Sequence, residues 1–400
     1  MQRKLDLRTG RPVWTAYRAP AVPTGRLTRD VSTDVLVVGM GIGGALLVDS
    51  LTAAGLDVVL IDRRGAMKGS TPATTALIQF EIDQPLSVLS KKIGRDKAER
   101  AWRRSRLALA SLKARIEDRR IACNMAERPS LYLAGSELGS RALEAEGEAR
   151  RAAGLAATFL PRAAMRETYG IDRAAIRSQG NITLDPRRLT AGLLLAARER
   201  GARFFAPVEA KDFVARKDGV DVTTDTGHII GAKHVILATG YEVMDFVPHA
   251  PHRIISTWAI ATRPQKPALW PERALIWEAS DPYLYLRATD DGRVICGGED
   301  EEFEDEEKRD ALIGEKSARI AEKLKALLPD LDTRPDFTWT GSFGTTTTGL
   351  PFIGALPNRP RIFAVMGYGG NGITYAEIAA ELITTAITGG NDPDTDLFAF

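Results

Sequence analysis

The chain of 400 residues carries 54 Lys and Arg against 52 Asp and Glu, a formal net charge of +2 at pH 7. This balance gives no overall field that would attract nucleic acid or an anionic membrane, so neither is expected as a partner. Hydrophobic residues make up 44% and charged residues 26% of the chain, which excludes collagen, coiled coil and disorder as descriptions of the whole sequence. Two cysteines, Cys123 and Cys296, exclude a disulfide framework and an all-cysteine metal site.

Single hydrophobic cores stop growing at about 250–300 residues, so the length predicts two domains or one domain with a large insertion. The first residues lack the apolar run of a signal peptide, and no stretch reaches the roughly 18 apolar residues of a membrane span. We therefore expect a cytoplasmic protein. Residues 9–33 are rich in Pro, Gly, Arg and Thr and predict an extended segment that leads into the first strand. Residues 1–29 are assigned to an N-terminal arm.

The first strong element is the continuous apolar run Asp34-Val35-Leu36-Val37-Val38, typical of a strand buried on both faces of a parallel sheet. A helix over about 43–54 and a second strand over 57–61 follow. Strand, helix and strand together predict one complete βαβ unit. The turn between the first strand and the helix therefore falls where such units bind a dinucleotide.

That turn reads Gly39-Met40-Gly41-Ile42-Gly43-Gly44, which fits G-x-G-x-x-G. The first glycine permits the tight turn, the second lets the backbone approach a pyrophosphate, and the last lets helix and strand pack closely. The amides at the helix start then stabilise phosphate charge.

An acidic residue should end the second strand and accept hydrogen bonds from a ribose, and Asp62 stands there. An acid at this position disfavours a ribose 2′-phosphate, so the sequence predicts FAD or NAD rather than NADP. Arg63 and Arg64 follow directly. They are candidates for contact with the cofactor, and the alternative is that both are solvent-exposed charges beyond the strand.

The rest of the chain alternates helical and strand patterns. Helices are predicted over about 95–120, 138–153, 185–201, 308–328 and after residue 372, with irregular sequence between 153 and 178. Further strands are predicted over 203–208, 234–240 and 361–366, with a hairpin over 210–224 and an antiparallel sheet over 253–298. The acidic block 299–307 is interpreted as a solvated loop near a helix start rather than a metal site. Parallel-sheet strands at the start, middle and end predict two interleaved domains.

Four segments together resemble the FAD-dependent amine and D-amino-acid oxidase superfamily, in particular its glycine oxidase and sarcosine oxidase group. They are the βαβ unit with Asp62, the small-residue loop 69–77, the segment from Asp185-Pro186 through Val208 to Ala238-Thr239-Gly240, and Gly349-Leu350-Pro351-Phe352-Ile353-Gly354 with the later Gly370-Asn371-Gly372-Ile373. The resemblance implies an α/β fold in which a Rossmann-like FAD domain of the glutathione-reductase type is interleaved with an antiparallel-sheet α+β substrate domain. We assign 30–90, 178–250 and 340–400 to the FAD domain, and 91–177 and 251–339 to the substrate domain.

The resemblance implies FAD as the cofactor. It is expected to be non-covalent, because the attaching cysteine of the sarcosine oxidase branch would fall near 345–348, where this chain has threonines. Backbone amides of the C-terminal glycine turn would stabilise charge on the reduced flavin. The predicted cofactor-binding residues are Gly39, Gly41, Ile42, Gly43, Gly44, Asp62, Arg63, Arg64, Ser70, Thr71, Thr74, Thr75, Ala76, Leu77, Val208, Thr239, Gly240, Gly344, Gly370, Asn371, Gly372, Ile373 and Thr374.

The substrate side departs from relatives that oxidise amino acids. Those relatives often anchor the substrate carboxylate with an arginine before the Leu-Pro-x-Ile-Gly segment, and residues 341–348 contain none. Arg287 is the best alternative anchor, because alternation could aim it at one strand face with Tyr283 and Tyr285; the competing interpretation is a sheet face packed by aromatics with an exposed arginine. Gln79 and Glu81 alternate in the segment after the small-residue loop and could also face the substrate, so the predicted catalytic set is Gln79, Glu81, Tyr285 and Arg287.

The residue patterns and the resemblance together predict an FAD-dependent oxidoreductase that removes hydride from the nitrogen-bearing carbon of an amine or amino acid, after which the imine product hydrolyses. The sarcosine oxidase branch carries a lysine near the flavin that would match 294–296 here, and none is present. O2 and another electron acceptor therefore both stay open, as does the oligomeric state. Alternatives are a flavoprotein dehydrogenase subunit or non-catalytic FAD module, and an NAD-dependent dehydrogenase. The histidines show no metal spacing, and His249 and His252 are interpreted as surface loop residues.

Overall fold

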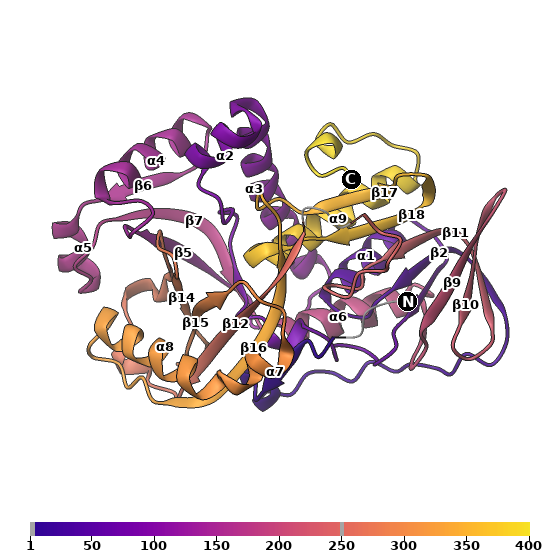
Figure 1. The fold of residues 1–400 in the computed structure, drawn as a ribbon, viewed down its shortest axis with the longest axis horizontal. Helices are drawn as coiled ribbons and strands as arrows, with labels where there is room; N and C mark the ends of the chain where they lie inside the picture. The colour runs from indigo at the N-terminus through magenta and orange to yellow at the C-terminus, as the bar shows by residue number, and fades with distance from the viewer. Residues whose placement is uncertain (1–4, 249–251) are drawn as a thin grey trace.

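The computed structural model describes residues 5–248 and 252–400, so the prediction for His249 lies outside the described residues. Two large sheets stand side by side (Figure 1). The first, the parallel sheet, has the strand order β17-β18-β11-β2-β3-β8, and the hairpin β9–β10 extends from β11. Its strands are β2 (Val31–Val38), β3 (Val58–Ile61), β8 (Arg203–Phe205), β9 (Ala210–Arg216), β10 (Gly219–Thr224), β11 (Ile229–Leu237), β17 (Phe352–Leu356) and β18 (Arg359–Met366).

The pairs β2–β3, β2–β11, β3–β8 and β11–β18 are all parallel. Their central residues are continuously apolar because helices or a further sheet layer cover both faces. These strands come from the start, middle and end of the chain, as the apolar runs predicted. The Rossmann-like arrangement of the predicted fold class is thereby confirmed, while the domain boundaries stay a prediction.

The second sheet, the antiparallel sheet, has the order β1-β16-β12-β15-β14-β13-β5-β7-β4, with β6 paired to β7. One neighbouring pair within it, β13–β5, is parallel. Its strands are β1 (Arg8–Gly10), β4 (Leu77–Ile78), β5 (Ala126–Leu133), β6 (Ala157–Leu160), β7 (Ala175–Thr183), β12 (Arg253–Thr262), β13 (Leu275–Glu278), β14 (Leu284–Ala288), β15 (Val294–Glu301) and β16 (Pro335–Thr345).

The helices divide between the two sheets (Figure 1). They are α1 (Ile42–Ala53), α2 (Leu86–Ile93), α3 (Arg95–Asp118), α4 (Ser140–Ala152), α5 (Arg162–Tyr169), α6 (Pro186–Glu199), α7 (Glu306–Ala311), α8 (Ile313–Leu327) and α9 (Gly372–Ile387). Short 3-10 turns are η1 (Val13–Ala16), η2 (Thr71–Ala73), η3 (Lys266–Ala268), η4 (Pro271–Arg273), η5 (Gly369–Asn371) and η6 (Thr395–Leu397).

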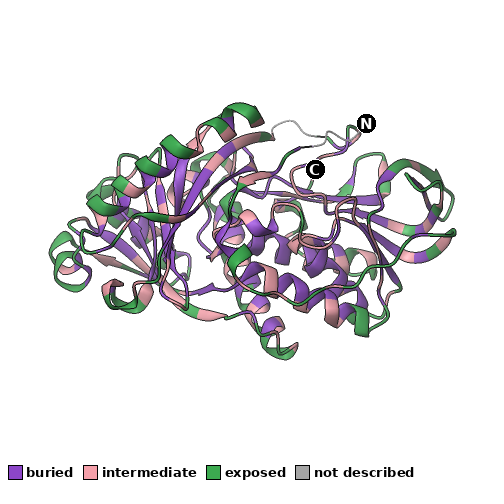
Figure 2. Cartoon of the chain, turned by 90° about the horizontal axis from the view of Figure 1, so that it is seen from below, coloured by how far each residue is buried: buried purple, intermediate pink, exposed green. Residues whose placement is uncertain are grey.

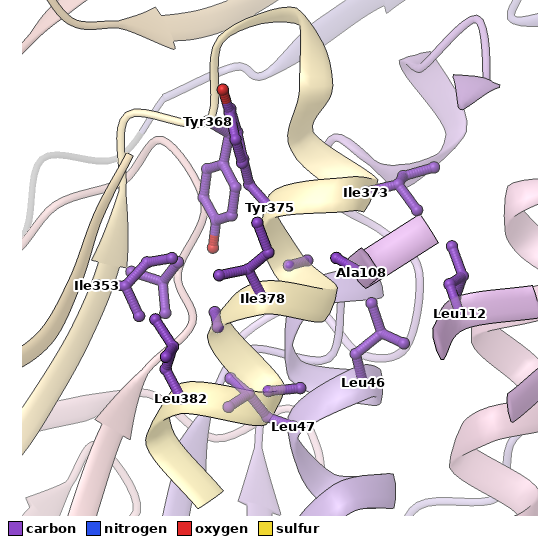
Figure 3. Close-up of a cluster of buried hydrophobic side chains, with 14 of the residues drawn as sticks. Leu46, Leu47, Ala108, Leu112, Ile353, Tyr368, Ile373, Tyr375, Ile378 and Leu382 are labelled. Carbon is purple, nitrogen blue, oxygen red and sulfur yellow. The ribbon is translucent and has the colours of Figure 1, made fainter. Parts of the chain in front are cut away.

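The main core lies where α1 and α9 pack together against the parallel sheet and α3. Leu46 and Leu47 of α1 meet Ile378 of α9, and Leu112 approaches from α3 (Figure 3). Helix α1 is buried on nearly all sides, which is why it is built from Gly, Ala, Leu and Val rather than from an amphipathic pattern. The outer helices of the antiparallel sheet are exposed on one side while the strands beneath are buried (Figure 2). This arrangement fixes the starts of α1 and α9 beside each other.

Three local predictions were wrong. The N-terminal arm is not extended throughout, because the 3-10 turn η1 interrupts it after β1. The segment 153–178 is not irregular, since it holds β6 and α5. The helix over 308–328 is two helices, α7 and α8, which meet at Leu312. No described helix is both long and apolar enough to cross a membrane, and the described residues contain no cluster of metal-ligand type.

Candidate active site

A large cavity is lined by elements of both sheets. The β2–α1 turn, the loop 69–79, the end of β11 and the start of α9 line it, together with residues of β12, β13, β14 and β16. The empty space between these elements, open mouth included, is about 1920 Å³. An extended ligand the size of a dinucleotide therefore has room.

The N-terminal glycine turn leaves one side of the backbone bare toward this cavity. Gly39 has φ +120° and a Cβ there would overlap the carbonyl of Ala238, while a Cβ at Gly44 would overlap the carbonyl oxygen of Gly39. Gly41 lines the cavity, and a Cβ on it would meet only the Thr71 hydroxyl, at 3.3 Å. The first and last glycines thus close the turn, and the middle one keeps open the approach that a pyrophosphate uses.

Asp62 holds the turn in place through its carboxylate. Oδ2 accepts from the N–H of Met40 at 2.8 Å, and Oδ1 accepts from Arg64 at 2.6 Å and Gly65 at 2.8 Å. Asp62 lines the cavity, so its side chain is accessible to a ligand. Contact with a ribose stays a prediction.

Arg63 and Arg64 are not the exposed charges of the alternative interpretation. Both bind the carboxylate of Glu242, which is 4% exposed, and the Arg64 Nη1 to Glu242 Oε2 distance is 2.6 Å. Both line the cavity. Their charges are therefore compensated within the protein.

The C-terminal glycine turn lines the same cavity. Thr374 Oγ1 donates to the carbonyl of Gln79 at 3.0 Å, and Asn371 Nδ2 donates to the carbonyl of Glu81 at 2.9 Å. A Cβ on Gly43 in α1 would lie 3.3 Å from the Tyr368 hydroxyl. The two glycine turns, far apart in sequence, thus face one space.

Most predicted cofactor residues line this cavity, and three do not. Gly44 and Ala76 are buried beside it, and a Cβ on Gly344 would overlap His252 instead of facing the cavity. The lining includes Gly39, Gly41, Ile42, Gly43, Asp62, Arg63, Arg64, Ser70, Thr71, Thr74, Thr75, Leu77, Val208, Thr239, Gly240, Gly370, Asn371, Gly372, Ile373 and Thr374.

Arg287 does not reach the cavity, contrary to prediction. It is 3% exposed, and its guanidinium donates to the carbonyls of Ala76 at 2.7 Å and Leu184 at 3.0 Å. Burial lowers the pKa of Arg287 to about 9. The group is therefore charged at neutral pH and its donors serve the backbone, so it is not placed to anchor a substrate.

Glu81 also points away from the cavity, while Gln79 lines it. The Glu81 carboxylate is fully buried and accepts from the hydroxyl of Ser130 and, at 3.4 Å, from Nδ2 of Asn181. The predicted alternation fails because β4 ends at Ile78, after which no strand geometry sets the side-chain direction. Gln79 is 7% exposed, and its Oε1 has no hydrogen-bond partner among the described residues.

Asp83 is the acidic residue that the sequence analysis missed. It lines the cavity, and its Oδ2 accepts from the N–H of Gly370 at 2.8 Å while Oδ1 lies 3.3 Å from Asn371 Nδ2. Asp83 stays exposed to solvent within the cavity, and the protein around it raises the pKa of its carboxylate above the ordinary value, against the effect of the Gly370 N–H. Its position two residues beyond Glu81 was the available signal.

Aromatic rings line the cavity near Asp83. Trp277 lies on β13, Tyr283 in the turn before β14 and Tyr285 on β14, and the two tyrosine rings lie 5.4 Å apart. Burial raises the pKa of Tyr285, so its hydroxyl stays protonated. Asp300 lies near the Tyr283 hydroxyl, and burial raises the pKa of Asp300 to about 6. This part of the cavity combines ring faces with acidic groups.

A parallel-sheet βαβ unit, a glycine turn open to a pyrophosphate and a second glycine turn at the same cavity define a dinucleotide-binding protein. Residues 34–386 match the family model described as FAD dependent oxidoreductase (DAO). The chain belongs to this family, and FAD is its cofactor.

Known relatives agree with this assignment. The chain is 25% identical over 380 residues to gamma-glutamylputrescine oxidoreductase of Escherichia coli, covering 92% of this chain and 86% of the relative. Two solved structures share the fold, each at 18% identity. L-proline dehydrogenase from P. horikoshii has a TM-score of 0.76, with 92% of this chain and 97% of that one covered. Glycine oxidase from Geobacillus kaustophilus has a TM-score of 0.73, with 91% and 96% covered.

Two structural observations indicate that the residues lining the cavity fit FAD. The Gly41 side of the turn is a cradle that a side chain would narrow, and buried polar atoms of two lining residues, Ser70 Oγ and Gln79 Oε1, have no partner among the described residues. Buried polar atoms are ordinarily paired, so a ligand with polar edges accounts for both. Neither Cys123 nor Cys296 belongs to the described cavity lining, and non-covalent binding of FAD stays a prediction.

Proposed function

We propose that the protein oxidises the C–N bond of an amine that has no carboxylate beside the nitrogen. The observation that carries this proposal is Asp83, a carboxylate that lines the cavity at the start of α9 among aromatic rings. The nitrogen of such a substrate is cationic in water. A carboxylate and ring faces are the groups that bind a cation in a partly dehydrated site.

The charges of the cavity disfavour a 2-amino acid. The arginines in its described lining are Arg63 and Arg64, and both bind Glu242 near the end of β3. A substrate carboxylate near Asp83 would therefore meet a like charge and no guanidinium. Asp300 is a second acidic group near this part of the cavity, and the charge of Asp83 is one cause of the raised pKa of Asp300.

Asp83 has a second use in the reaction. Hydride leaves a carbon only when the adjacent nitrogen is neutral, so the substrate ammonium must first lose a proton. The Asp83 carboxylate accepts it, and its raised pKa makes it a stronger base than an ordinary aspartate. Bound FAD supplies the hydride acceptor. Trp277, Tyr283 and Tyr285 orient the amine and exclude water during hydride transfer. Water hydrolyses the imine product afterwards.

The name of the E. coli relative supports an amine substrate, since it contains gamma-glutamylputrescine. The electron acceptor is O2 or another oxidant. We assign the protein no nucleic-acid partner and expect it in the cytoplasm.

The test uses matched pairs of compounds that differ by one carboxylate. The FAD-loaded protein is mixed without oxygen with butylamine or norvaline, and with N-methylbutylamine or N-methylnorvaline, while the flavin absorption is followed. We expect the amines to bleach the flavin and their carboxylated partners to leave it oxidised. Bleaching by the 2-amino acids alone would refute the proposal.

A further inference from the structure

The N-terminal arm contacts the cavity although it precedes the family match, which begins at residue 34. Leu7 of the arm is itself part of the cavity lining. The N–H of Leu5 donates to Glu242 at 2.8 Å, and the carbonyl of Leu5 accepts from Arg64 Nη2 at 2.9 Å. The start of the arm is therefore fixed to the residues beyond β3 and β11 that line one side of the cavity.

The next residues of the arm fix it to the opposite side. The carbonyl of Asp6 accepts from Arg309 Nη1 at 2.8 Å, and the carbonyl of Leu7 accepts from the N–H of Ser342 at 3.3 Å. Ser342 lies on β16 and lines the cavity. Arg8 Nε donates to the carbonyl of Gly69 at 3.3 Å. Residues 5–8 therefore span the cavity between the two sheets.

Further along the arm, Trp14 binds the loop 69–76, whose residues line the cavity. Nε1 of Trp14 donates to the carbonyl of Thr74 at 2.6 Å. Trp339 donates from β16 to the carbonyl of Ala73 at 2.8 Å, and Arg287 donates to Ala76 at 2.7 Å. The Arg287 guanidinium also lies 5.3 Å from the Trp14 ring centre. Three buried side chains thus fix three carbonyls of this loop, whose Ser70, Thr71, Thr74 and Thr75 line the cavity.

We propose that residues 5–17 are a strap that retains FAD, with Trp14 as the positioning residue for the loop 69–76. Trp14 acts through the loop and not on the cofactor itself. Arg187 holds Trp14 in turn, since its Nη1 donates to the Trp14 carbonyl at 2.8 Å. The inference rests on FAD binding in this cavity but not on the identity of the amine.

The test compares two tryptophan substitutions that each remove one buried N–H donor and keep a ring. Trp14→Phe loses the bond to the loop carbonyl. Trp270→Phe loses a bond of 2.8 Å to the carbonyl of Ala274 in the core of the antiparallel sheet, away from the described cavity lining. The dissociation constant of FAD is measured by flavin fluorescence on the full-length apoprotein, together with the melting temperature of the apoprotein.

We expect Trp14→Phe to raise the FAD dissociation constant about tenfold, the effect of one lost hydrogen bond. Trp270→Phe should lower the melting temperature and leave the dissociation constant unchanged. Arg187→Gln is the second variant, in which Trp14 itself is intact, and it should also weaken FAD binding. FAD affinity within twofold of the wild-type value in both Trp14→Phe and Arg187→Gln would overturn the proposal. A substrate of another class would not change these results.

Discussion

Two glycines three positions apart in the N-terminal turn should respond differently to the same added methyl group. At Gly41 the backbone has φ −82° and ψ −171°, which alanine adopts without strain. The nearest atom to a new Cβ is the Thr71 hydroxyl at 3.3 Å, which can rotate. At Gly44 the new Cβ would overlap the Gly39 carbonyl oxygen and lie 3.0 Å from its carbon, so helix and strand must separate.

The expected magnitudes follow from these surroundings. Gly41→Ala should leave the stability of the apoprotein within about 0.5 kcal/mol of the wild type. It should weaken FAD binding about 100-fold, because the methyl group blocks one or two hydrogen bonds to a charged phosphate, each worth about 1.5–3 kcal/mol. Gly44→Ala should destabilise the apoprotein itself by about 3 kcal/mol, the upper range for overpacking.

Two measurements on each variant separate these effects. Chemical denaturation of the apoprotein gives the free energy of unfolding, and fluorescence titration gives the dissociation constant of FAD. The reasoning is refuted if Gly41→Ala destabilises the apoprotein as much as Gly44→Ala, or if Gly41→Ala binds FAD with wild-type affinity.

Three further substitutions test other parts of the site. Asp83→Asn should lower kcat/KM for amines about 100-fold. In the wild type kcat/KM should fall as pH drops through the raised pKa of Asp83, because only the carboxylate accepts a proton. Steady-state rates measured against pH should show this fall in the wild type and not in the variant. Glu242→Gln should cost about 3 kcal/mol of unfolding free energy in denaturant titrations, because Arg63 and Arg64 lose a shared buried partner. Arg287→Met should cost a similar amount in the same titrations, since carbonyls including that of Ala76 lose their donor, and an unchanged midpoint would contradict this.

The glycine turn and its flanking strands could be predicted because their signals are local. A continuous apolar run, glycine spacing and an acid at a fixed distance follow from the geometry of one βαβ unit. The C-terminal turn was placed at the same ligand only through the resemblance to a family, because sequence spacing alone does not show that Gly43 and Tyr368 lie together.

The substrate end was less predictable because its side chains depend on packing between distant segments. Glu81 and Asp83 share one alternation in sequence, yet the strand ends before them and only Asp83 lines the cavity. Arg287 lies two positions after Tyr285 on the same strand, as predicted, but that distance takes it under the loop 69–76. The partner of Trp14 is a loop carbonyl 60 residues away, and no local pattern encodes such a pair.

The most direct test of the account is an experimental structure of the FAD-loaded protein. The account predicts the pyrophosphate at the Gly39–Gly44 turn and the isoalloxazine beside Gly370–Thr374, with Asp83 on the substrate side of the ring. A flavin bound elsewhere, or density at one of the two turns alone, would contradict it.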